Sequence, residues 1–289
     1  MPPIGAPRVA SDAAIGKNQS LLYVSDGPSY VYMVALPSGR LVGKLTGLNA
    51  PSGVCADQSG NVFVSNSGQA QIRAYAHGAK SAFRVLNDSP YAPVGCSVDP
   101  TTGNLAVCNN QSGQTEATIA VYRKAKGRAH FYKRFANFWY CAYDGDGNLF
   151  ADGVNHNSND PIFLLELPKG HSKLQRVTLT PNITGNVSPP LFWDGKHLAI
   201  ASPSSGAIDE YQISGSTAKR VGVVKLDDTN EVTGPFWISA EGAKQTLYAP
   251  IIVNSVASVG VYSYPSGGKR LANLYDAPLP YAVTISAAK

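Results

Sequence analysis

Three aspartates in this 289-residue sequence begin the same short pattern, in which an acid is followed by a Gly-Asn pair and an apolar run. Carboxylates at such spacing can bind Ca²⁺, and DGDGN (144–148) together with Asp152 resembles the start of a calcium-binding loop. However, Leu149 stands where an EF-hand loop requires glycine, and Asn155 stands where the loop uses a bidentate glutamate. We therefore interpret the shared aspartates as residues that cap tight turns without binding a metal: Asp57, Asp99 and Asp144.

The four cysteines show no C-x-x-C spacing, so a thiolate zinc site is not expected. Cys96 and Cys141 stand three residues before Asp99 and Asp144, which places them at the same position of the repeated pattern. Such positions are typical of core packing, and free cysteine is a common small core residue. Buried thiols are the first expectation, and a Cys96–Cys108 disulfide is the alternative.

The five histidines are predicted to lie apart, in turns and in one insertion, so neither a catalytic triad nor a three-histidine metal site is expected. Their positions are His77, His130, His156, His171 and His197. The sequence also lacks a nucleophile elbow and a phosphate-binding loop, and we expect no cofactor.

A basic cluster covers residues 122–134 (YRKAKGRAHFYKR) in a chain of net charge +5. Such charge could attract nucleic acid or another anionic polymer. Charged residues are equally expected on a solvated edge strand, where they discourage pairing with other chains. Because the other repeats show no matching basic stripe, we predict no nucleic-acid partner.

The elements that position these residues follow from the repeat around each aspartate. A proline and an apolar run precede the acid, and three further apolar or alternating runs follow it, separated by turns rich in Gly, Asn and Asp. Alternation with period two between such turns predicts four antiparallel strands in each repeat.

Six repeats are legible from the residues at the proline position, which are 42 to 52 residues apart: Pro51, Pro93, Phe138, Pro190, Pro235 and Pro280. The last repeat provides only a first strand, at 280–286, whereas the chain begins with strands that lack a first one, from residue 21. These two ends complete one another. The sequence thus predicts an all-β fold, a six-bladed β-propeller with four antiparallel strands per blade, closed by the C-terminal strand in the N-terminal blade.

The pattern P-x-G-[apolar]-x-x-D…G-N, continued by an apolar run and I-x-x-Y, resembles NHL-repeat and related six-bladed propellers of bacterial secreted proteins. The resemblance covers roughly residues 20–286. It implies the blade and says little about activity, because propellers serve as enzymes, receptors and scaffolds.

Related metal-dependent lactonases place Glu, Asn or Asp at the mouth of the central channel, directly after the proline position. Here the corresponding residues include no carboxylate and no amide: Ser52, Val94, Trp139, Leu191, Phe236 and Tyr281. A hard cation needs oxygen ligands, so this ring is predicted to hold no metal. Its aromatic members, backed by Tyr91, Tyr140, Trp193 and Trp237, are expected either to fill the channel or to stack on a flat, apolar or sugar-like ligand.

Composition agrees with a turn-rich all-β protein, since 44% of the residues are apolar, 15% are charged and Gly and Pro number 28 and 20. Residues 1–19 are expected to form an N-terminal arm, and residues 20–289 a single propeller domain. No apolar run is long enough to span a membrane. An extracellular or periplasmic location is expected from the resemblance.

Three functions remain open at this stage. The first is a secreted or periplasmic module that binds a ligand or a protein partner without metal-dependent chemistry. The second is a metal-independent lyase or hydrolase at the channel mouth, and the third is a structural subunit of a surface assembly. A ligand, if bound, is expected at the aromatic mouth.

Overall fold

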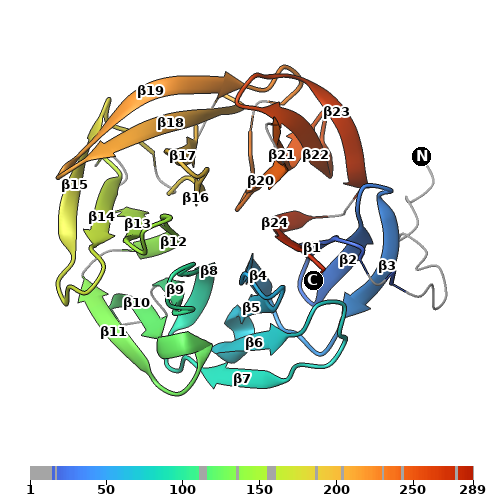
Figure 1. The fold of residues 1–289 in the computed structure, drawn as a ribbon, viewed down its shortest axis with the longest axis horizontal. Helices are drawn as coiled ribbons and strands as arrows, with labels where there is room; N and C mark the ends of the chain where they lie inside the picture. Colours follow the sequence, from blue (N-terminus) through green and yellow to red (C-terminus); the bar gives the residue numbers. More distant parts are fainter. Residues whose placement is uncertain are drawn as a thin grey trace.

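A computed structural model describes most of the chain, and Figure 1 shows its sheets arranged as a ring around a common axis. The described residues are 15–16, 18–110, 116–134, 137–154, 161–185, 188–202, 205–229, 231–241, 244–276 and 279–288. The predicted N-terminal arm lies mostly outside them. Within the described part, the elements are strands and two short 3-10 turns, η1 (Ser67–Gln69) and η2 (Arg123–Ala125). No helix among these residues has the length and hydropathy needed to cross a membrane.

Four sheets are meanders of four antiparallel strands, with the first-named strand nearest the axis. The strands are β24-β1-β2-β3 (Pro280–Ser286, Leu21–Asp26, Tyr30–Ala35, Arg40–Leu45); β4-β5-β6-β7 (Pro51–Ala56, Val62–Asn66, Gln71–Tyr75, Arg84–Asn87); β8-β9-β10-β11 (Ala92–Val98, Leu105–Asn110, Ala117–Tyr122, Ala129–Arg134); and β20-β21-β22-β23 (Trp237–Glu241, Lys244–Val253, Val256–Tyr264, Gly267–Asp276).

The fifth sheet has eight strands and consists of two such meanders joined at their outer edges. They are β12-β13-β14-β15 (Asn137–Tyr143, Leu149–Val154, Phe163–Leu167, Gln175–Thr180) and β16-β17-β18-β19 (Leu191–Trp193, Leu198–Ala201, Ala207–Ser214, Thr217–Lys225). Strands β15 and β19 pair in parallel over three residue pairs, Thr178–Thr217 to Thr180–Lys219. The sheet count is therefore five where six separate sheets were expected, because two edge strands with unpaired backbone groups meet at the outer rim.

The pairing expected between the two ends of the chain is present. Strand β24 lies antiparallel to β1, from Leu21 opposite Ser286 to Asp26 opposite Pro280. Polar side chains reinforce it, since the Leu279 N–H donates to Asp26 Oδ1 (2.7 Å) and the Ala282 N–H donates to Ser25 Oγ (3.0 Å). The C-terminal strand thus provides the innermost position of the N-terminal sheet.

Tyrosines in the core connect neighbouring sheets through their hydroxyls. Tyr122, Tyr211 and Tyr262 have no exposed surface, and each hydroxyl finds a partner outside its own strand. The Tyr122 hydroxyl on β10 donates to Asp88 Oδ1 (2.5 Å), in the loop after β7 of the previous sheet, and the Tyr262 hydroxyl donates to Asp228 (2.8 Å). These contacts satisfy polar groups that burial would otherwise leave unpaired.

The turn aspartates have the structural role predicted for them. Asp57 Oδ1 accepts the N–H groups of Ser59 (2.8 Å) and Asn61 (2.9 Å), and Asp144 makes the same bonds to Asp146 (3.0 Å) and Asn148 (2.8 Å). In the longer turn after β8, Asp99 Oδ1 accepts the Thr101 N–H (2.8 Å). These carboxylates hold the turns that lead from the first to the second strand of each sheet.

Removing residues 280–289 is expected to abolish cooperative unfolding, because the deletion removes β24 and exposes the edge of β1 to solvent. Chemical denaturation followed by circular dichroism measures this. A chain ending at Ala287 retains all of β24 and is the control, for which a cooperative transition is expected. A cooperative transition in the larger deletion would contradict the assigned closure.

Stability is expected to decrease as the pH rises from about 4 to about 7 because of Asp88. Its side chain is fully buried, and this burial raises the pKa of the carboxyl to about 7, partly opposed by hydrogen bonds from Tyr122 and Asn109. An unfolded aspartate titrates near pH 3.9, so the folded state binds the proton more tightly between about pH 4 and pH 7. The favourable contribution is complete below about pH 4 and is lost as the pH rises through about 7.

Asp88→Asn remains neutral at every pH and keeps an oxygen acceptor for Tyr122. It is expected to remove most of this decrease, which amounts to a few kcal/mol between about pH 5 and pH 8. Urea denaturation of both proteins at the two pH values measures it, with the exposed Asp146→Asn as control. Equal pH dependence in the wild type and Asp88→Asn would exclude Asp88 as the cause.

Candidate functional site

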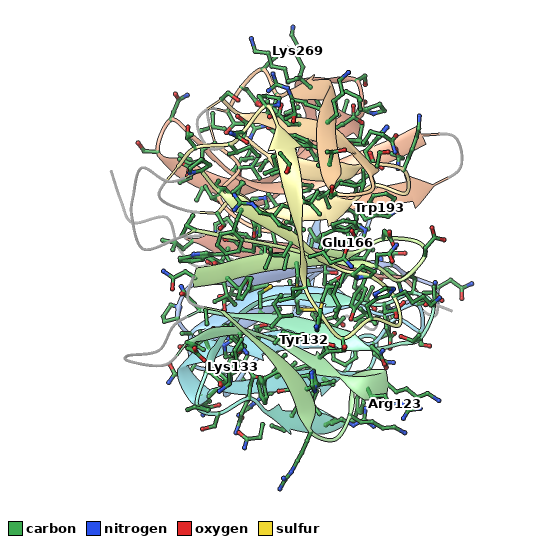
Figure 2. All side chains as sticks on the ribbon, turned by 90° about the vertical axis from the view of Figure 1, so that its left-hand side faces the viewer. Arg123, Tyr132, Lys133, Glu166, Trp193 and Lys269 are labelled. Carbon is green, nitrogen blue, oxygen red and sulfur yellow. A yellow bond between two sulfur atoms is a disulfide. The ribbon has the colours of Figure 1, made fainter. Side chains whose placement is uncertain are left out.

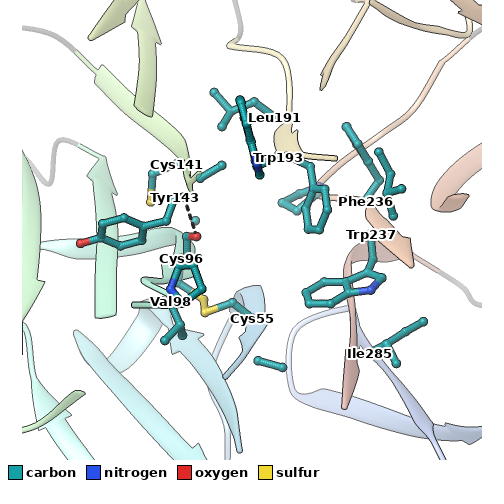
Figure 3. Close-up of a pocket in the computed structure, with 18 of the residues that line it drawn as sticks. Cys55, Cys96, Val98, Cys141, Tyr143, Leu191, Trp193, Phe236, Trp237 and Ile285 are labelled. Atoms are coloured by element: carbon teal, nitrogen blue, oxygen red, sulfur yellow. Dashed lines mark hydrogen bonds between the residues drawn. A yellow bond between two sulfur atoms is a disulfide. The ribbon is translucent and has the colours of Figure 1, made fainter. Parts of the chain in front are cut away.

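A pocket of about 530 Å³ lies on the central axis, within the range typical of small-ligand sites. Its walls come from the six innermost strands, β4, β8, β12, β16, β20 and β24, and from the turns that follow them. Figure 3 shows side chains from these separate strands directed around one open space. The site therefore exists only because the ring brings strands from the whole length of the chain together.

One side of the pocket is aromatic. Trp193 at the end of β16, and Phe236 and Trp237 at the start of β20, line it together with Phe192. The Trp193 ring lies parallel to that of Phe150, with centroids 6.5 Å apart and 9° between the planes. Trp237 and Phe236 both contact the Phe192 ring, at 5.1 and 6.2 Å. These contacts orient the indoles and leave aromatic surface directed at the cavity.

The rest of the wall is mainly aliphatic and contains a disulfide. Val98, Val283 and Ile285 line it, with Ile285 beside Trp237, and the Cys55–Cys96 bond joins β4 to β8 (Figure 3). Aromatic and aliphatic surface thus border one cavity, and both favour a ligand with apolar surface.

Two tyrosines close the channel near the start of the inner strands. Tyr140 on β12 and Tyr281 on β24 meet with their hydroxyl oxygens 3.2 Å apart. Burial raises the pKa of both hydroxyls, so both stay protonated at neutral pH. Tyr140 also lines the pocket and forms part of its floor.

Glycines allow the close packing of the inner strands at this end. A Cβ at Gly53 would collide with the Val94 carbonyl, and a Cβ at Gly234 would collide with the Tyr281 carbonyl. Backbones approach here in a way that only glycine permits. This end of the channel is therefore filled, and the open space lies next to the later residues of β4, β8, β12 and β24 and the first residues of β16 and β20.

The six residues predicted for the channel mouth divide between these two regions. Leu191 and Phe236 line the pocket, whereas Ser52, Val94, Trp139 and Tyr281 do not. Ser52 Oγ donates to the Pro93 carbonyl (3.1 Å), Val94 is buried, and the ring of Trp139 lies 6.4 Å from that of Tyr140. Trp193 and Trp237, which the sequence indicated only as supporting residues, contribute directly to the wall.

The cysteine expectation was wrong for two of the four residues. Cys55 and Cys96 form a disulfide with their Cα atoms 5.8 Å apart, while Cys108 and Cys141 are buried thiols. The alternative Cys96–Cys108 bond is not formed. The reason is geometric: Cys55 stands one residue away from the shared cysteine position, and successive side chains of a strand point to opposite faces. Cys55 therefore faces the next sheet, where Cys96 faces back towards it.

Carboxylates at the edge of the pocket are already engaged by their turns. Asp57 and Asp144 line the cavity, but each receives the backbone hydrogen bonds described above. Asp152, the last acid of the calcium-like pattern, is buried and accepts the Tyr140 N–H (3.1 Å), and burial raises its pKa well above the usual range. These aspartates therefore do not converge as a calcium-binding loop would require.

A cluster that the sequence analysis missed lies in the turn after β16. His197 Nδ1 is 3.4 Å from Asp194 Oδ2 and 3.7 Å from Glu210 Oε1. The spacing of Asp194 and His197 resembles an ordinary turn, and Glu210 is one of many charged strand residues. Only the pairing of β17 with β18 brings the three together, so no sequence signal distinguished them.

The basic cluster does not form a single patch. Arg123 and Lys133 lie at opposite ends of the β10–β11 hairpin, and Figure 2 shows them towards opposite faces of the ring. Lys133 Nζ also lies 3.9 Å from Glu116 Oε2. This arrangement suits a solvated outer edge.

Comparison with known proteins identifies the fold. No family model matches the chain, and no curated protein matches it. Among solved structures, a protein of unknown function from Bacteroides caccae is similar, with a TM-score of 0.65 and 13% identity over 93% of this chain and 99% of that one. A chain in the crystal structure of a nidogen/laminin complex has a TM-score of 0.67 and 14% identity over the same shares.

A functionally unknown protein from Desulfotomaculum acetoxidans is also similar, with a TM-score of 0.65 and 10% identity over 94% of this chain and 100% of that one. At such identities the likeness concerns the fold alone. The chain has an all-β fold of the β-propeller type, and the resemblance to NHL repeats stays a prediction.

Asp99→Ala is expected to lower the free energy of unfolding by about 1 kcal/mol, as for other lost caps, because three donors in its turn lose their acceptor. Urea denaturation measures the change. Asp146→Ala, an exposed carboxylate in the equivalent turn of the next sheet, is the control and should change stability by less than about 0.5 kcal/mol. Unchanged stability in Asp99→Ala would contradict the capping role.

Proposed function

We propose that this protein is a six-bladed β-propeller that binds a flat or apolar ligand in its central pocket, without metal-dependent chemistry. The observation that carries the proposal is the pocket itself. About 530 Å³ of space remains on the axis although the other end of the channel is filled. Aromatic surface on one part of the wall and aliphatic surface on the rest favour stacking and burial of a ligand.

The six-blade interpretation is supported by how the eight-stranded sheet divides. Each half is an antiparallel meander that begins with an inner strand, β12 or β16, in the same way as the four separate sheets. Among the described residues, the strand pairing that joins the halves is the short parallel pairing of β15 with β19 at the rim. Counting each half as a blade gives six inner strands around the axis, and all six line the pocket.

An extracellular or periplasmic location is supported by the disulfide. Disulfides persist in oxidising compartments and are rare in reducing ones. The Cys55–Cys96 bond joins the inner strands of two neighbouring sheets and forms part of the pocket wall. A secreted or periplasmic binding module accommodates both the disulfide and the central pocket.

A protein partner is the second candidate. One structure of similar fold was determined as a nidogen/laminin complex, in which proteins are bound to one another. If a protein is the partner of this chain, the ring face that carries the pocket opening is its expected docking site, because the partly exposed indoles of Trp193 and Trp237 line that opening.

Replacing Trp237 by Ala is expected to weaken ligand binding about fivefold to 150-fold, which corresponds to 1–3 kcal/mol for a buried aromatic contact. The probe is anilinonaphthalene sulfonate, a flat aromatic dye whose emission increases in apolar surroundings. A fluorescence titration of the wild type and the variant measures the change in Kd.

Trp139→Ala is the matched control, because Trp139 belongs to the filled end of the channel and does not line the pocket. Its Kd is expected to stay within about twofold of the wild-type value. If Trp139→Ala weakens binding and Trp237→Ala does not, the ligand lies at the start of the inner strands and the pocket assignment is wrong. Circular dichroism confirms that both variants are folded.

A further inference from the structure

The cluster of Asp194, His197 and Glu210 lies between two neighbouring sheets, close to the pocket but largely outside it. Asp194 and His197 belong to the turn between β16 and β17, and Glu210 is on β18 of the same meander. The fourth member is Tyr264 at the end of β22 in the next sheet, whose hydroxyl reaches both carboxylates. Only Asp194 also lines the pocket.

The distances within the cluster fit the coordination shell of a small divalent cation. His197 Nδ1 lies 3.4 Å from Asp194 Oδ2 and 3.7 Å from Glu210 Oε1, and the three ligand atoms lie within 4.8 Å of one another. Zinc binds carboxylate oxygen and imidazole nitrogen at about 2.0–2.2 Å, so neighbouring corners of its tetrahedron are about 3.3–3.6 Å apart. The Tyr264 hydroxyl lies 2.8 and 3.1 Å from the same two carboxylates, which are hydrogen-bond distances shorter than these edges, so it orients the carboxylates as a donor and is not a ligand.

Local structure holds each ligand atom in place. Asp194 Oδ1 accepts the N–H groups of Lys196 (2.7 Å) and His197 (2.6 Å), which leaves Oδ2 directed at the imidazole and at Tyr264. Glu210 lies against Gly222 of β19, where any larger side chain would collide with its carboxylate. Gln245 in the next sheet donates to the Asp194 carbonyl (2.6 Å).

The charge of the cluster also favours a cation. The side chains of Asp194 and Glu210 are 4% and 13% exposed, and among the described residues the imidazole of His197, which carries charge only when protonated, is the single basic group found within ion-pair distance of either one. Two carboxylates at this burial are costly without compensating charge. Burial, and after it the two carboxylates, raise the pKa of Tyr264, so its hydroxyl stays a neutral donor.

The turn after β12 is equivalent to the turn after β16, and comparing the two shows what distinguishes the cluster. In the turn after β12, Asn148 occupies the place of His197. The Asn148 carbonyl accepts the Asp144 N–H, and the His197 carbonyl accepts the Asp194 N–H in the same way. Glu166 has the place of Glu210, because Phe150 pairs with Glu166 as Ala199 pairs with Glu210. There the Asn148 amide donates to Asp144 Oδ2 (2.7 Å) and satisfies that oxygen within the turn.

We propose that Asp194, His197 and Glu210 form a binding site for a divalent transition-metal ion, with Zn²⁺ as the best fit, and that Tyr264 orients the two carboxylates from the neighbouring sheet. Two oxygens and one imidazole suit zinc better than calcium or magnesium, which prefer oxygen ligands alone. The bound ion would lie between two sheets at the rim of the pocket and would not require a ligand in the pocket.

The test is isothermal titration of ZnCl₂ into chelator-treated, dialysed protein. One Zn²⁺ per chain is expected for the wild type. His197→Asn reproduces the residue found in the equivalent turn, and it is expected to weaken binding at least tenfold, as is Glu210→Gln. Glu166→Gln and His171→Asn are matched controls from the other meander of the same eight-stranded sheet, with expected affinities within about twofold of the wild-type value.

Saturating Zn²⁺ should also raise the Tm of the wild type and leave that of His197→Asn unchanged. The proposal is overturned if the wild type binds no Zn²⁺, if both cluster variants bind it as the wild type does, or if the controls lose as much affinity. Should His197→Asn fail to fold, the pair Glu210→Gln and Glu166→Gln decides. Titration of the fluorescent dye in the presence of chelator tests the pocket separately, so the two proposals can fail independently.

Discussion

The antiparallel pairing of β24 with β1 is the interaction on which the rest of this structure depends. It joins residues more than 250 positions apart and turns a row of sheets into a ring. Without it, β1 would present an unpaired edge and the N-terminal sheet would lack its innermost strand. Every feature on the axis requires this closure, because Val283 and Ile285 of β24 line the pocket and Tyr281 meets Tyr140 across the channel.

Closure crowds the inner strands at one end and separates their side chains at the other. Where the strands begin, glycines such as Gly53 and Gly234 let backbones approach closely, and the paired tyrosines fill what remains. Away from this crowded end, the walls are formed by side chains, and the indoles of Trp193 and Trp237 lie against other rings instead of against each other. A channel closed at one end is a pocket, and its apolar walls follow from the hydrophobic residues that the inner strands need.

Polar groups connect the sheets to one another. Buried hydroxyls such as that of Tyr122 reach acids in the preceding sheet, while Tyr264 reaches back to Asp194 and Glu210. A buried polar atom is costly unless it is paired, so these contacts favour one relative placement of neighbouring sheets. The disulfide between Cys55 and Cys96 does the same covalently between β4 and β8. The surroundings of the pocket are therefore held by directional bonds as well as by apolar packing.

The sequence by itself determined the local elements and their repetition. The sequence shows alternation with period two, Gly-Asn turns and capping acids such as Asp57 and Asp144, because these act between neighbouring residues. The unpaired first strand at 280–286 indicated the closure. Only the tertiary structure decided that Cys55 pairs with Cys96, that β15 meets β19 at the rim, and which end of the channel stays open. Only the tertiary structure likewise brings Asp194, His197 and Glu210 together. These features depend on the twist and spacing of neighbouring sheets, which place residues far apart in sequence within a few ångströms and which no local pattern encodes.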